Sequence, residues 1–391
     1  MRPSPSARPS TSRGAARCVF WVVLLAGASL GAAAAPQPLP RLFSCFGADP
    51  SRPDEMASRY AVVIWHNHPQ LRQALRQMKR RNPSATGLMY RELFCVLQQE
   101  GPLGESVGGH DWIAAHHPEW FQRDLQGRRV EVPDYPGRWM MDMGHPGWQA
   151  FWIESTLRDV DAGGWDGVFV DDALTTVRSH ALPALAGYPD DASLQEAVTG
   201  FLRRITDAFH RREKLVIANA SNTYDAPGLW ERWLAVTDGL MEEHFAGQGW
   251  SWGRDVAPRQ LEAMRAAARS GKRMFCMTYG SWDDRGRMET SLAAYLIGEA
   301  PGIYWSYRPP KPSDRPAWDA AWQLAVGEPV GEPEALGTVW QRKFQRGVAL
   351  VNIGPEPQQV VTPCAEVPLQ PHEGRVISSD CRRNRSASAW P

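Results

Sequence analysis

Short apolar runs alternate with helix-like segments along most of the chain. Each run is bounded by polar or turn-forming residues and is typical of a buried strand, and most of the intervening segments carry apolar residues at helical spacing. We expect these strands at 60–65, 87–90, 139–143, 166–171, 214–219, 238–243, 273–278 and 302–306. Strands that alternate with helices over about 250 residues predict an α/β fold of the (β/α)8 TIM-barrel type. An open doubly wound sheet is the alternative, but no glycine-rich phosphate loop follows the first run.

The two ends of the chain differ from this middle part. Residues 1–35 are typical of a signal peptide, because four Arg and no acid precede an apolar run and a stretch of Ala. The apolar run is short for a membrane span, so we expect cleavage and export to the periplasm or the medium. A leader is expected at 36–58, the catalytic barrel at 59–325, and a small β-rich C-terminal domain with its tail at 326–391. We expect that domain to cap the barrel.

Composition narrows the classes of partner. The formal net charge is zero, which gives no reason to expect nucleic acid as a partner. The five Cys beyond the predicted signal peptide show no metal-binding spacing, and Cys364 with Cys381 could form a disulfide in an oxidising compartment. The chain has 18 Trp, most of which we expect to pack in the core, while others could stack on sugar rings.

The run from Trp165 to Asp172 ends in two adjacent carboxylates, and a related run follows downstream. Asp171 comes five residues after the Asp of one Asp-Gly pair, and Glu243 comes five residues after the Asp of another. The carboxyl ends of parallel barrel strands meet at one mouth, where barrel enzymes carry their chemistry. Two strands that each deliver a carboxylate there are what acid/base glycoside hydrolysis requires. The sequence therefore predicts Asp171 and Glu243 as the catalytic pair.

Neighbouring polar residues complete the predicted site. Side chains alternate between the two faces of a strand, so one member of each acidic pair should point into the mouth. This counting favours Asp171 over Asp172 and Glu243 over Glu242, which remain the alternates. Glu92 also stands at a strand end, and the residues expected to bind substrate are His66, Arg91, Asp142, Asn219, Tyr279 and Trp305. Asp142 and Asn219 could instead serve turns.

The sequence His66-Asn67-His68 leaves a second chemistry open. Alternate strand positions share a face, so these two imidazoles could bind a metal as they do in amidohydrolases. Such sites also need a Lys or further His on the middle strands and a late Asp, whereas this chain has Asn219 and Ser306 there. A metal-dependent barrel hydrolase is therefore the alternative, and a non-catalytic carbohydrate-binding barrel is the third hypothesis. The leading hypothesis needs no metal and no cofactor.

Three motifs together carry a resemblance to a known group of proteins. They are Trp-Asp-Gly-Val-Phe-Val-Asp-Asp at 165–172, Met-Asp-Met-Gly-His-Pro-Gly-Trp at 141–148 and Asp-Gly-Leu-Met-Glu-Glu-His-Phe at 238–245. Over about residues 43–310 the chain resembles a hypothetical family of bacterial glycoside hydrolases, similar to the endo-α-1,4-polygalactosaminidase type, which are TIM barrels.

This resemblance implies roles for particular residues. Asp171 and Glu243 would be the acids that end strands four and six, Asp142 would be a sugar-binding neighbour, and the substrate would be a polysaccharide or oligosaccharide. Asp172 stands where such motifs commonly have Asn or Thr, and Glu242 doubles the second acid.

Overall fold

The computed structural model describes residues 40–45, 50–99, 101, 104–221, 223, 226–247, 256–309, 318–319, 322 and 326–378. The predicted signal peptide and Cys381 lie outside the described residues. Within the described part of the chain, no helix combines the length and the apolar character needed to cross a membrane.

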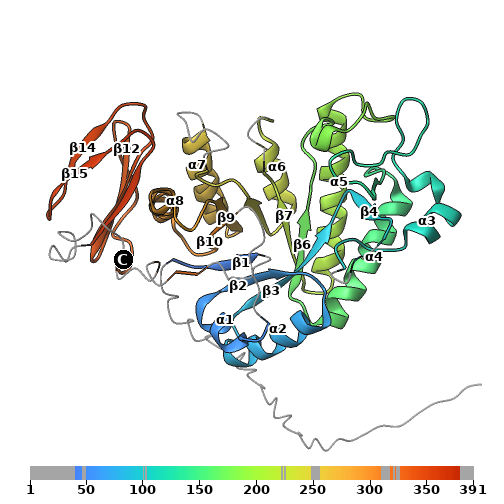
Figure 1. Ribbon diagram of the computed structural model, residues 1–391, viewed down its shortest axis with the longest axis horizontal. Helices are drawn as coiled ribbons and strands as arrows, with labels where there is room; N and C mark the ends of the chain where they lie inside the picture. The colour runs from blue at the N-terminus through green and yellow to red at the C-terminus, as the bar shows by residue number, and fades with distance from the viewer. Residues whose placement is uncertain are drawn as a thin grey trace, which may run out of the picture. The chain divides into compact units, whose positions relative to one another are not determined.

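Eight parallel strands form one sheet and follow each other in chain order (Figure 1). They are β1 Phe43–Cys45, β2 Val62–Trp65, β3 Thr86–Glu92, β6 Gly167–Asp171, β7 Leu215–Asn219, β8 Gly239–Glu242, β9 Arg273–Tyr279 and β10 Ile303–Arg308. The sheet closes because Leu42 forms a parallel bridge with Trp305, whose backbone N–H donates to the Arg41 carbonyl at 2.9 Å. The predicted (β/α)8 barrel is confirmed.

Helices connect the strands and cover the outside of the sheet (Figure 1). They are α1 Pro53–Arg59, α2 Pro69–Arg81, α4 Pro146–Gly163, α5 Asp191–His210, α6 Leu229–Val236, α7 Val256–Arg269 and α8 Arg285–Gly298. Helices α2 and α4 begin alike: a His side chain accepts a hydrogen bond from the backbone, and Pro occupies the first helical position. Proline suits that position because its fixed φ is helical and its missing N–H would have no partner there.

One of the eight barrel strands differs from the prediction. The run at 139–143 contains β5 (Arg138–Met140), which pairs antiparallel with β4 (Cys95–Leu97) outside the barrel sheet. The strand that completes the barrel is β1, which lies within the segment expected to be a leader. The barrel therefore begins at Phe43. Three residues are too few to stand out as an apolar run, and β1 becomes a strand through its pairing with β2.

The connection between β3 and β6 is long and spans residues 93–166. It contains the β4–β5 pair, α3 (His110–His116), the 3-10 turn η1 (Pro118–Trp120) and finally α4. Long connections inside a compact domain are usually functional.

Side chains of the barrel strands alternate between two cores. The inner cluster lies between the strands and contains Phe43, Cys45, Val62, Ile64, Leu88, Tyr90, Phe169, Ile217, Met241, Phe275 and Met277. The alternate positions, including Val63, Trp65, Met89, Val168 and Val170, pack in the outer cluster with the helices. Because both faces are buried, the strands are continuous apolar runs and do not show an apolar/polar alternation.

The two Asp-Gly pairs have the same structural role. Asp166 Oδ2 accepts a hydrogen bond from the Gly87 N–H of β3 at 2.7 Å, and Asp238 Oδ2 accepts one from the Val216 N–H of β7 at 2.8 Å. Each Asp therefore satisfies a backbone donor near the start of the preceding strand in the sheet. The glycine that follows begins the next strand, which brings an acid to the other end of the barrel.

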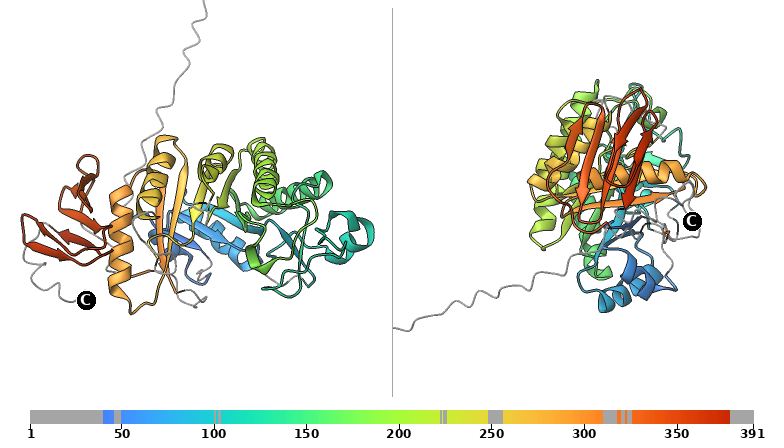
Figure 2. Two further views of the ribbon diagram at one scale, coloured as in Figure 1. Left: turned by 90° about the horizontal axis from the view of Figure 1, so that it is seen from above. Right: turned by 90° about the vertical axis from the view of Figure 1, so that its left-hand side faces the viewer.

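The C-terminal part of the chain forms antiparallel sheets. A four-stranded sheet has the order β11 Glu334–Leu336, β12 Val339–Phe344, β13 Gly347–Asn352 and β16 Gly374–Ser378, and β14 Gln358–Val361 pairs with β15 Glu366–Leu369. Strand β16 packs against α8, where the Gly374 N–H donates to Thr290 Oγ1 at 3.0 Å (Figure 2). Arg375 forms an ion pair with Glu289 of the same helix at 2.9 Å. The small β domain that the sequence predicts is thus attached to the barrel through α8.

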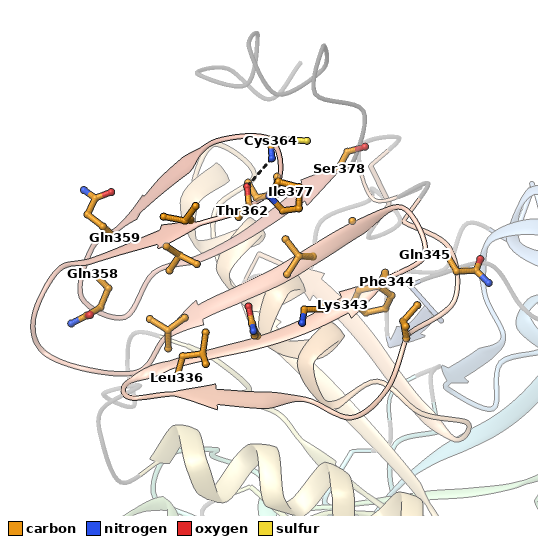
Figure 3. A pocket seen from close by; sticks show the side chains of 18 residues that line it. Leu336, Lys343, Phe344, Gln345, Gln358, Gln359, Thr362, Cys364, Ile377 and Ser378 are labelled. Atoms are coloured by element: carbon orange, nitrogen blue, oxygen red, sulfur yellow. Dashed lines mark hydrogen bonds between the residues drawn. The ribbon is translucent and has the colours of Figure 1, made fainter.

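A hollow of about 670 Å³ lies in this domain and is lined by residues of both sheets (Figure 3). Its apolar lining includes Leu336, Val348 and Val360, and among the described lining residues Phe344 is the only aromatic. Phe344 is itself buried, so it offers no open ring face on which a sugar could stack. Cys364 at the rim is disulfide-bonded, whereas Cys45, Cys95 and Cys276 are free and buried.

We predict that Gly239→Ala lowers the free energy of unfolding by about 1–3 kcal/mol, because strand β8 approaches β9 too closely for a side chain. A Cβ at Gly239 would lie 2.4 Å from the Arg273 carbonyl oxygen. The matched control is Gly200→Ala in α5, where a Cβ would meet nothing within 4 Å. That change should stabilise the protein by about 0.5–1 kcal/mol through helix propensity. Urea denaturation measures both, and equal midpoints for the two variants would contradict the prediction.

Candidate active site

The inward faces of the strands continue into the barrel mouth as polar residues. The last apolar or aromatic inward positions of five strands are Tyr90, Phe169, Ile217, Met241 and Met277. Two positions further along each strand come Glu92, Asp171, Asn219, Glu243 and Tyr279. Since alternate residues of a strand share a face, these five polar side chains follow the inner core toward the same opening. Hydrogen bonds between them show that they meet there.

Asn219 links the two predicted catalytic acids. Its Nδ2 donates to Asp171 Oδ1 at 2.8 Å and to Glu243 Oε2 at 2.7 Å. The amide is held in this orientation because its Oδ1 accepts from the hydroxyl of Ser221 at 2.8 Å and from the Ser221 N–H at 3.2 Å. The two bonds to the acids limit the distance between the bridged carboxylate oxygens to at most about 5.5 Å.

Two tyrosines hold the outer oxygens of the same acids. The Tyr279 hydroxyl donates to Glu243 Oε1 at 2.6 Å. The Tyr90 hydroxyl lies 2.7 Å from Asp171 Oδ2 and 2.7 Å from Glu92 Oε2. Each catalytic candidate therefore has a protein group at both carboxylate oxygens, and Glu92 is joined to the pair through Tyr90.

The electrostatic environment at the barrel mouth raises the pKa of two carboxyl groups and so favours their protonated forms. Burial, followed by the charges of Glu243 and Glu92, raises the pKa of Asp171 to about 7. Burial and then the charge of Asp172 raise the pKa of Glu92 to about 8, although Arg138 Nη1 lies 2.9 Å from Glu92 Oε1 and acts in the opposite direction. A carboxyl with a pKa near neutrality can hold a proton at the pH where it must exchange one.

Asp171 and Glu243 line a cavity of about 500 Å³, within the range of small-ligand sites. Its walls also include side chains that the sequence reasoning missed, namely Tyr90, Tyr135, Arg138, Thr175, Ser179, His180, Ser221 and His244. Tyr90 is two residues from Leu88 and could have been found by counting inward positions. Tyr135, Arg138 and His180 come from segments between strands, for which the only signal was the length of the connection.

Asp171 and Asp172 both line the cavity, whereas the sequence predicted that only one of them would. The reason is the backbone of Asp172, whose φ of 50° turns the chain out of the strand and interrupts the alternation. Asp172 Oδ1 lies 3.3 Å from His180 Nε2, and this hydrogen bond raises the pKa of His180.

Glu242 follows the alternation. Its carboxylate is buried away from the cavity lining and accepts a hydrogen bond from the His244 N–H at 3.0 Å.

Of the six residues expected to bind substrate, only Asn219 lines this cavity. His66 and Tyr279 contact the lining residues Tyr90 and Glu243, whereas Arg91, Asp142 and Trp305 lie elsewhere. Arg91 points to the outside of the sheet, where it forms an ion pair with Asp159 of α4 at 2.6 Å. Trp305 is fully buried in the outer core against Trp322. Asp142 follows β5 outside the barrel and accepts from the Gly144 N–H at 3.0 Å. Arg91 and Trp305 occupy outward positions of β3 and β10. Asp142 was expected at the mouth because the run at 139–143 was predicted to be a barrel strand, which it is not.

His66 and His68, the alternative metal-binding pair, have separate environments. The His66 ring lies 4.9 Å from the Tyr90 ring, and burial lowers the pKa of His66 to about 4, so the imidazole is neutral. His68 caps α2 by accepting from the Gln70 N–H at 3.3 Å. Among the described residues, the group whose oxygens lie close enough to share an ion is Glu92, Asp171 and Asp172, and it includes neither histidine.

A closed (β/α)8 barrel with two linked carboxyl groups at the carboxyl ends of its fourth and sixth strands defines the class of barrel glycoside hydrolases. The model of the hypothetical glycosyl hydrolase family 15 matches residues 79–348, well over half of the chain. The chain belongs to this family. The glycoside-hydrolase resemblance predicted from the three motifs is confirmed.

Solved structures of other proteins are similar to this chain. A GH31 dextranase of Flavobacterium johnsoniae complexed with glucose is 10% identical, with a TM-score of 0.53 over 87% of this chain and 50% of that chain. The noncanonic maltogenic α-amylase AmyB from Thermotoga neapolitana is 9% identical, with a TM-score of 0.47 over 87% and 97%. Aspergillus fumigatus Ega3, in complex with galactosamine, is 11% identical, with a TM-score of 0.44 over 71% and 94%. The likeness to the dextranase shows a shared fold and nothing further. No curated protein matches the chain.

We predict that Asp171→Asn stabilises the protein at alkaline pH. Below about pH 4 the Asp171 carboxyl is protonated in both the folded and the unfolded chain, so its ionisation does not change the free energy of unfolding. As the pH rises, the unfolded chain ionises first because the pKa of Asp171 is raised in the folded state, and the stability of the wild type falls through pH 7. The variant should gain on the order of 1–3 kcal/mol at pH 8 and nothing near pH 4.

Thermal unfolding across this pH range measures the effect. The control is Asp111→Asn, the same change of charge at a side chain that is 94% exposed and lies outside the cavity. A wild-type advantage at pH 8 would contradict the raised pKa.

Proposed function

We propose that the protein is an exported glycoside hydrolase that cleaves O-glycosidic bonds of a polysaccharide or oligosaccharide with Asp171 and Glu243. The observation that carries this proposal is the Asn219 amide, which donates to both carboxylates from a buried position. Glycoside cleavage needs one carboxyl to protonate the leaving oxygen and a second to attack carbon or activate water. A linked pair that binds a proton near neutral pH meets both needs.

The spacing of the pair favours retention of configuration. Retaining enzymes hold their carboxyl groups about 5–5.5 Å apart, whereas inverting enzymes leave about 6.5–9.5 Å for a water molecule. The bridged oxygens of Asp171 and Glu243 are at most about 5.5 Å apart; they are the nearer oxygens of the two groups, and their closeness is what favours the shorter arrangement. We therefore propose a double displacement through a covalent glycosyl-enzyme intermediate, in which the acid of the first step becomes the base of the second.

The cavity walls supply contacts of the kind a sugar needs. Tyr135 is 44% exposed and presents an aromatic ring beside the mouth, with the Arg138 guanidinium 5.0 Å from its centroid. Asp172 and His180, together with Thr175, offer hydrogen-bonding groups to ring hydroxyls on the same wall. An aromatic face combined with convergent polar groups suits the apolar and hydroxyl faces of a sugar ring.

We expect Asp171→Asn and Glu243→Gln each to lower kcat by about 10³-fold or more on a glycan that the wild type cleaves, because each removes a group that reacts in the transition state. Reducing-end release from a panel of polysaccharides, galactosaminoglycans included, identifies the substrate. The control is Glu242→Gln, which changes the adjacent acid that faces away from the cavity and should retain turnover. All variants must still unfold cooperatively.

Proton NMR of the first-formed product tests the stereochemistry, and the expected anomer is that of the substrate. The opposite anomer would refute the double displacement while leaving the two acids in place. Turnover that survives in both acid variants would refute the assignment of Asp171 and Glu243. Glycan binding without turnover on any substrate would support the non-catalytic carbohydrate-binding barrel.

Export rests on the amino-terminal sequence. The basic segment, the apolar run and the Ala residues at 32–35 have the order of a cleavable signal. The disulfide at Cys364 is compatible with an oxidising compartment. We expect the protein recovered from the periplasm or medium to begin just after this Ala stretch. Amino-terminal sequencing tests this, and a full-length protein retained in the cytoplasm would refute export.

A further inference from the structure

The Tyr90 hydroxyl connects Asp171 to a third carboxyl group. It lies at 2.7 Å from Asp171 Oδ2 and at the same distance from Glu92 Oε2. Both distances are those of strong O–H···O hydrogen bonds. Glu92 ends β3, is fully buried, and takes no direct part in the proposed chemistry.

A phenol hydroxyl has a single proton, so it can donate to only one of these two oxygens. If both carboxyls were ionised, the second contact would place two oxygens at 2.7 Å with no proton between them. One carboxyl must therefore be protonated and must donate to the Tyr90 oxygen. We propose that Glu92 holds this proton and acts as a positioning residue that makes the Tyr90 hydroxyl a donor to Asp171.

The surroundings of the two carboxyls decide which one is protonated. Asp171 is half-buried and receives a second hydrogen bond from Asn219, which stabilises its ionised form. Glu92 is 0% exposed, and the oxygens of Asp171 and Asp172 lie within 4.8 Å of it. Burial and like charge both favour the neutral acid at Glu92.

The groups that face Glu92 from other elements do not reverse this balance. Arg138 of β5 favours ionisation, but its guanidinium is shared with Glu105 at 3.4 Å. The Cys95 thiol of β4 lies 3.7 Å from Glu92 Oε1 and is a weak donor. His180 faces Asp172, with which it pairs. With all of these present, burial and the Asp172 charge still raise the pKa of Glu92 to about 8.

The consequence for the reaction depends on the proposed function, whereas the location of the proton does not. With Glu92 neutral, Asp171 accepts from both Tyr90 and Asn219 and is kept as the ionised carboxylate that attack on carbon requires. When Glu92 ionises, it competes for the Tyr90 proton, and Asp171 loses a donor. Through Tyr90, the protonation state of Glu92 thus influences the charge state of the pair Asp171 and Glu243.

The proton can be located without a substrate. In protein labelled with ¹³C at the Glu carboxyl carbons, the Glu92 resonance is identified by its absence in Glu92→Gln. We expect it to titrate with a midpoint above pH 7 in the wild type. The control is Glu105→Gln, which removes the other carboxyl on Arg138 without touching Tyr90 and should leave that midpoint above pH 7. A Glu92 carboxyl that titrates near pH 4–5, as in a model peptide, would overturn the proposal.

Kinetic measurements test whether Glu92 acts on Asp171 through the Tyr90 hydroxyl. A Gln at position 92 can donate to Tyr90 and accept from Arg138 as the protonated acid does, so Glu92→Gln should retain most of the wild-type kcat near neutral pH. Tyr90→Phe should lower kcat about tenfold, the loss of one charge-assisted hydrogen bond. The double variant should be no slower than Tyr90→Phe alone, because Glu92 acts through that hydroxyl.

The outcomes separate the two proposals. Additive losses in the double variant, or a Glu92→Gln protein as inactive as Asp171→Asn, would overturn the positioning role. A raised Glu92 midpoint in a protein that cleaves no glycan would leave the proton assignment in place and refute the proposed function.

Discussion

Closure of the sheet by its shortest strand is the constraint on which the remaining structure depends. Strand β1 has three residues, yet it pairs with β2 on one side, and the chain just before it hydrogen-bonds to β10 on the other. Phe43 of β1 meets Phe275 of β9 across the interior, with ring centroids 5.1 Å apart. Without this closure two sheet edges would be open and the inner core would be exposed to water. With it, the carboxyl ends of all eight strands surround one opening.

Several carboxyl groups lie close together at that opening, and the fold must accommodate their negative charge. Three carboxyl groups, from Glu92, Asp171 and Glu243, lie near one another in a partly dehydrated mouth, where their like charges oppose full ionisation. At Asp171 and Glu243 the protein meets this cost with neutral donors, since Asn219, Tyr90 and Tyr279 supply hydrogen bonds without adding a counter-charge, whereas Glu92 also has the Arg138 guanidinium at 2.9 Å. A site built with neutral donors keeps its protons exchangeable. A tightly paired Arg on each acid would instead hold it ionised and unable to donate a proton.

The family and the fold also limit which roles the polar residues can have. Positions that face the interior reach the mouth, whereas positions that face the helices become structural, however polar they are. Arg91 shows this directly, because its guanidinium is buried against α4 beside two mouth residues of the same strand. Asp172 is the exception, and its left-handed backbone is the type of strained conformation that clusters at functional sites.

The barrel and the two acids were accessible from sequence because they depend on local patterns. Runs buried on both faces are continuous and apolar, and Asp166 and Asp238 mark equivalent strands by satisfying equivalent backbone donors. The same reasoning failed at 139–143, because a strand of an antiparallel pair outside the barrel has the same local composition as a barrel strand. Counting alternate positions from Leu88 would have excluded Arg91 and drawn attention to Tyr90.

By itself, then, the sequence determined the barrel class, seven of the eight barrel strands and the acids Asp171 and Glu243 at the ends of two of them. The tertiary structure alone decided that Asn219 bridges Asp171 and Glu243, that Tyr90 touches two carboxyls, and that Tyr135 and His180 join the cavity. The physical reason is the separation along the chain over which each kind of interaction acts. Alternation and burial act between residues that are neighbours in the chain, whereas the contacts of Asn219 with the two acids and of Tyr90 with Asp171 join residues 24 to 81 positions apart, whose distances are set by strand register and closure.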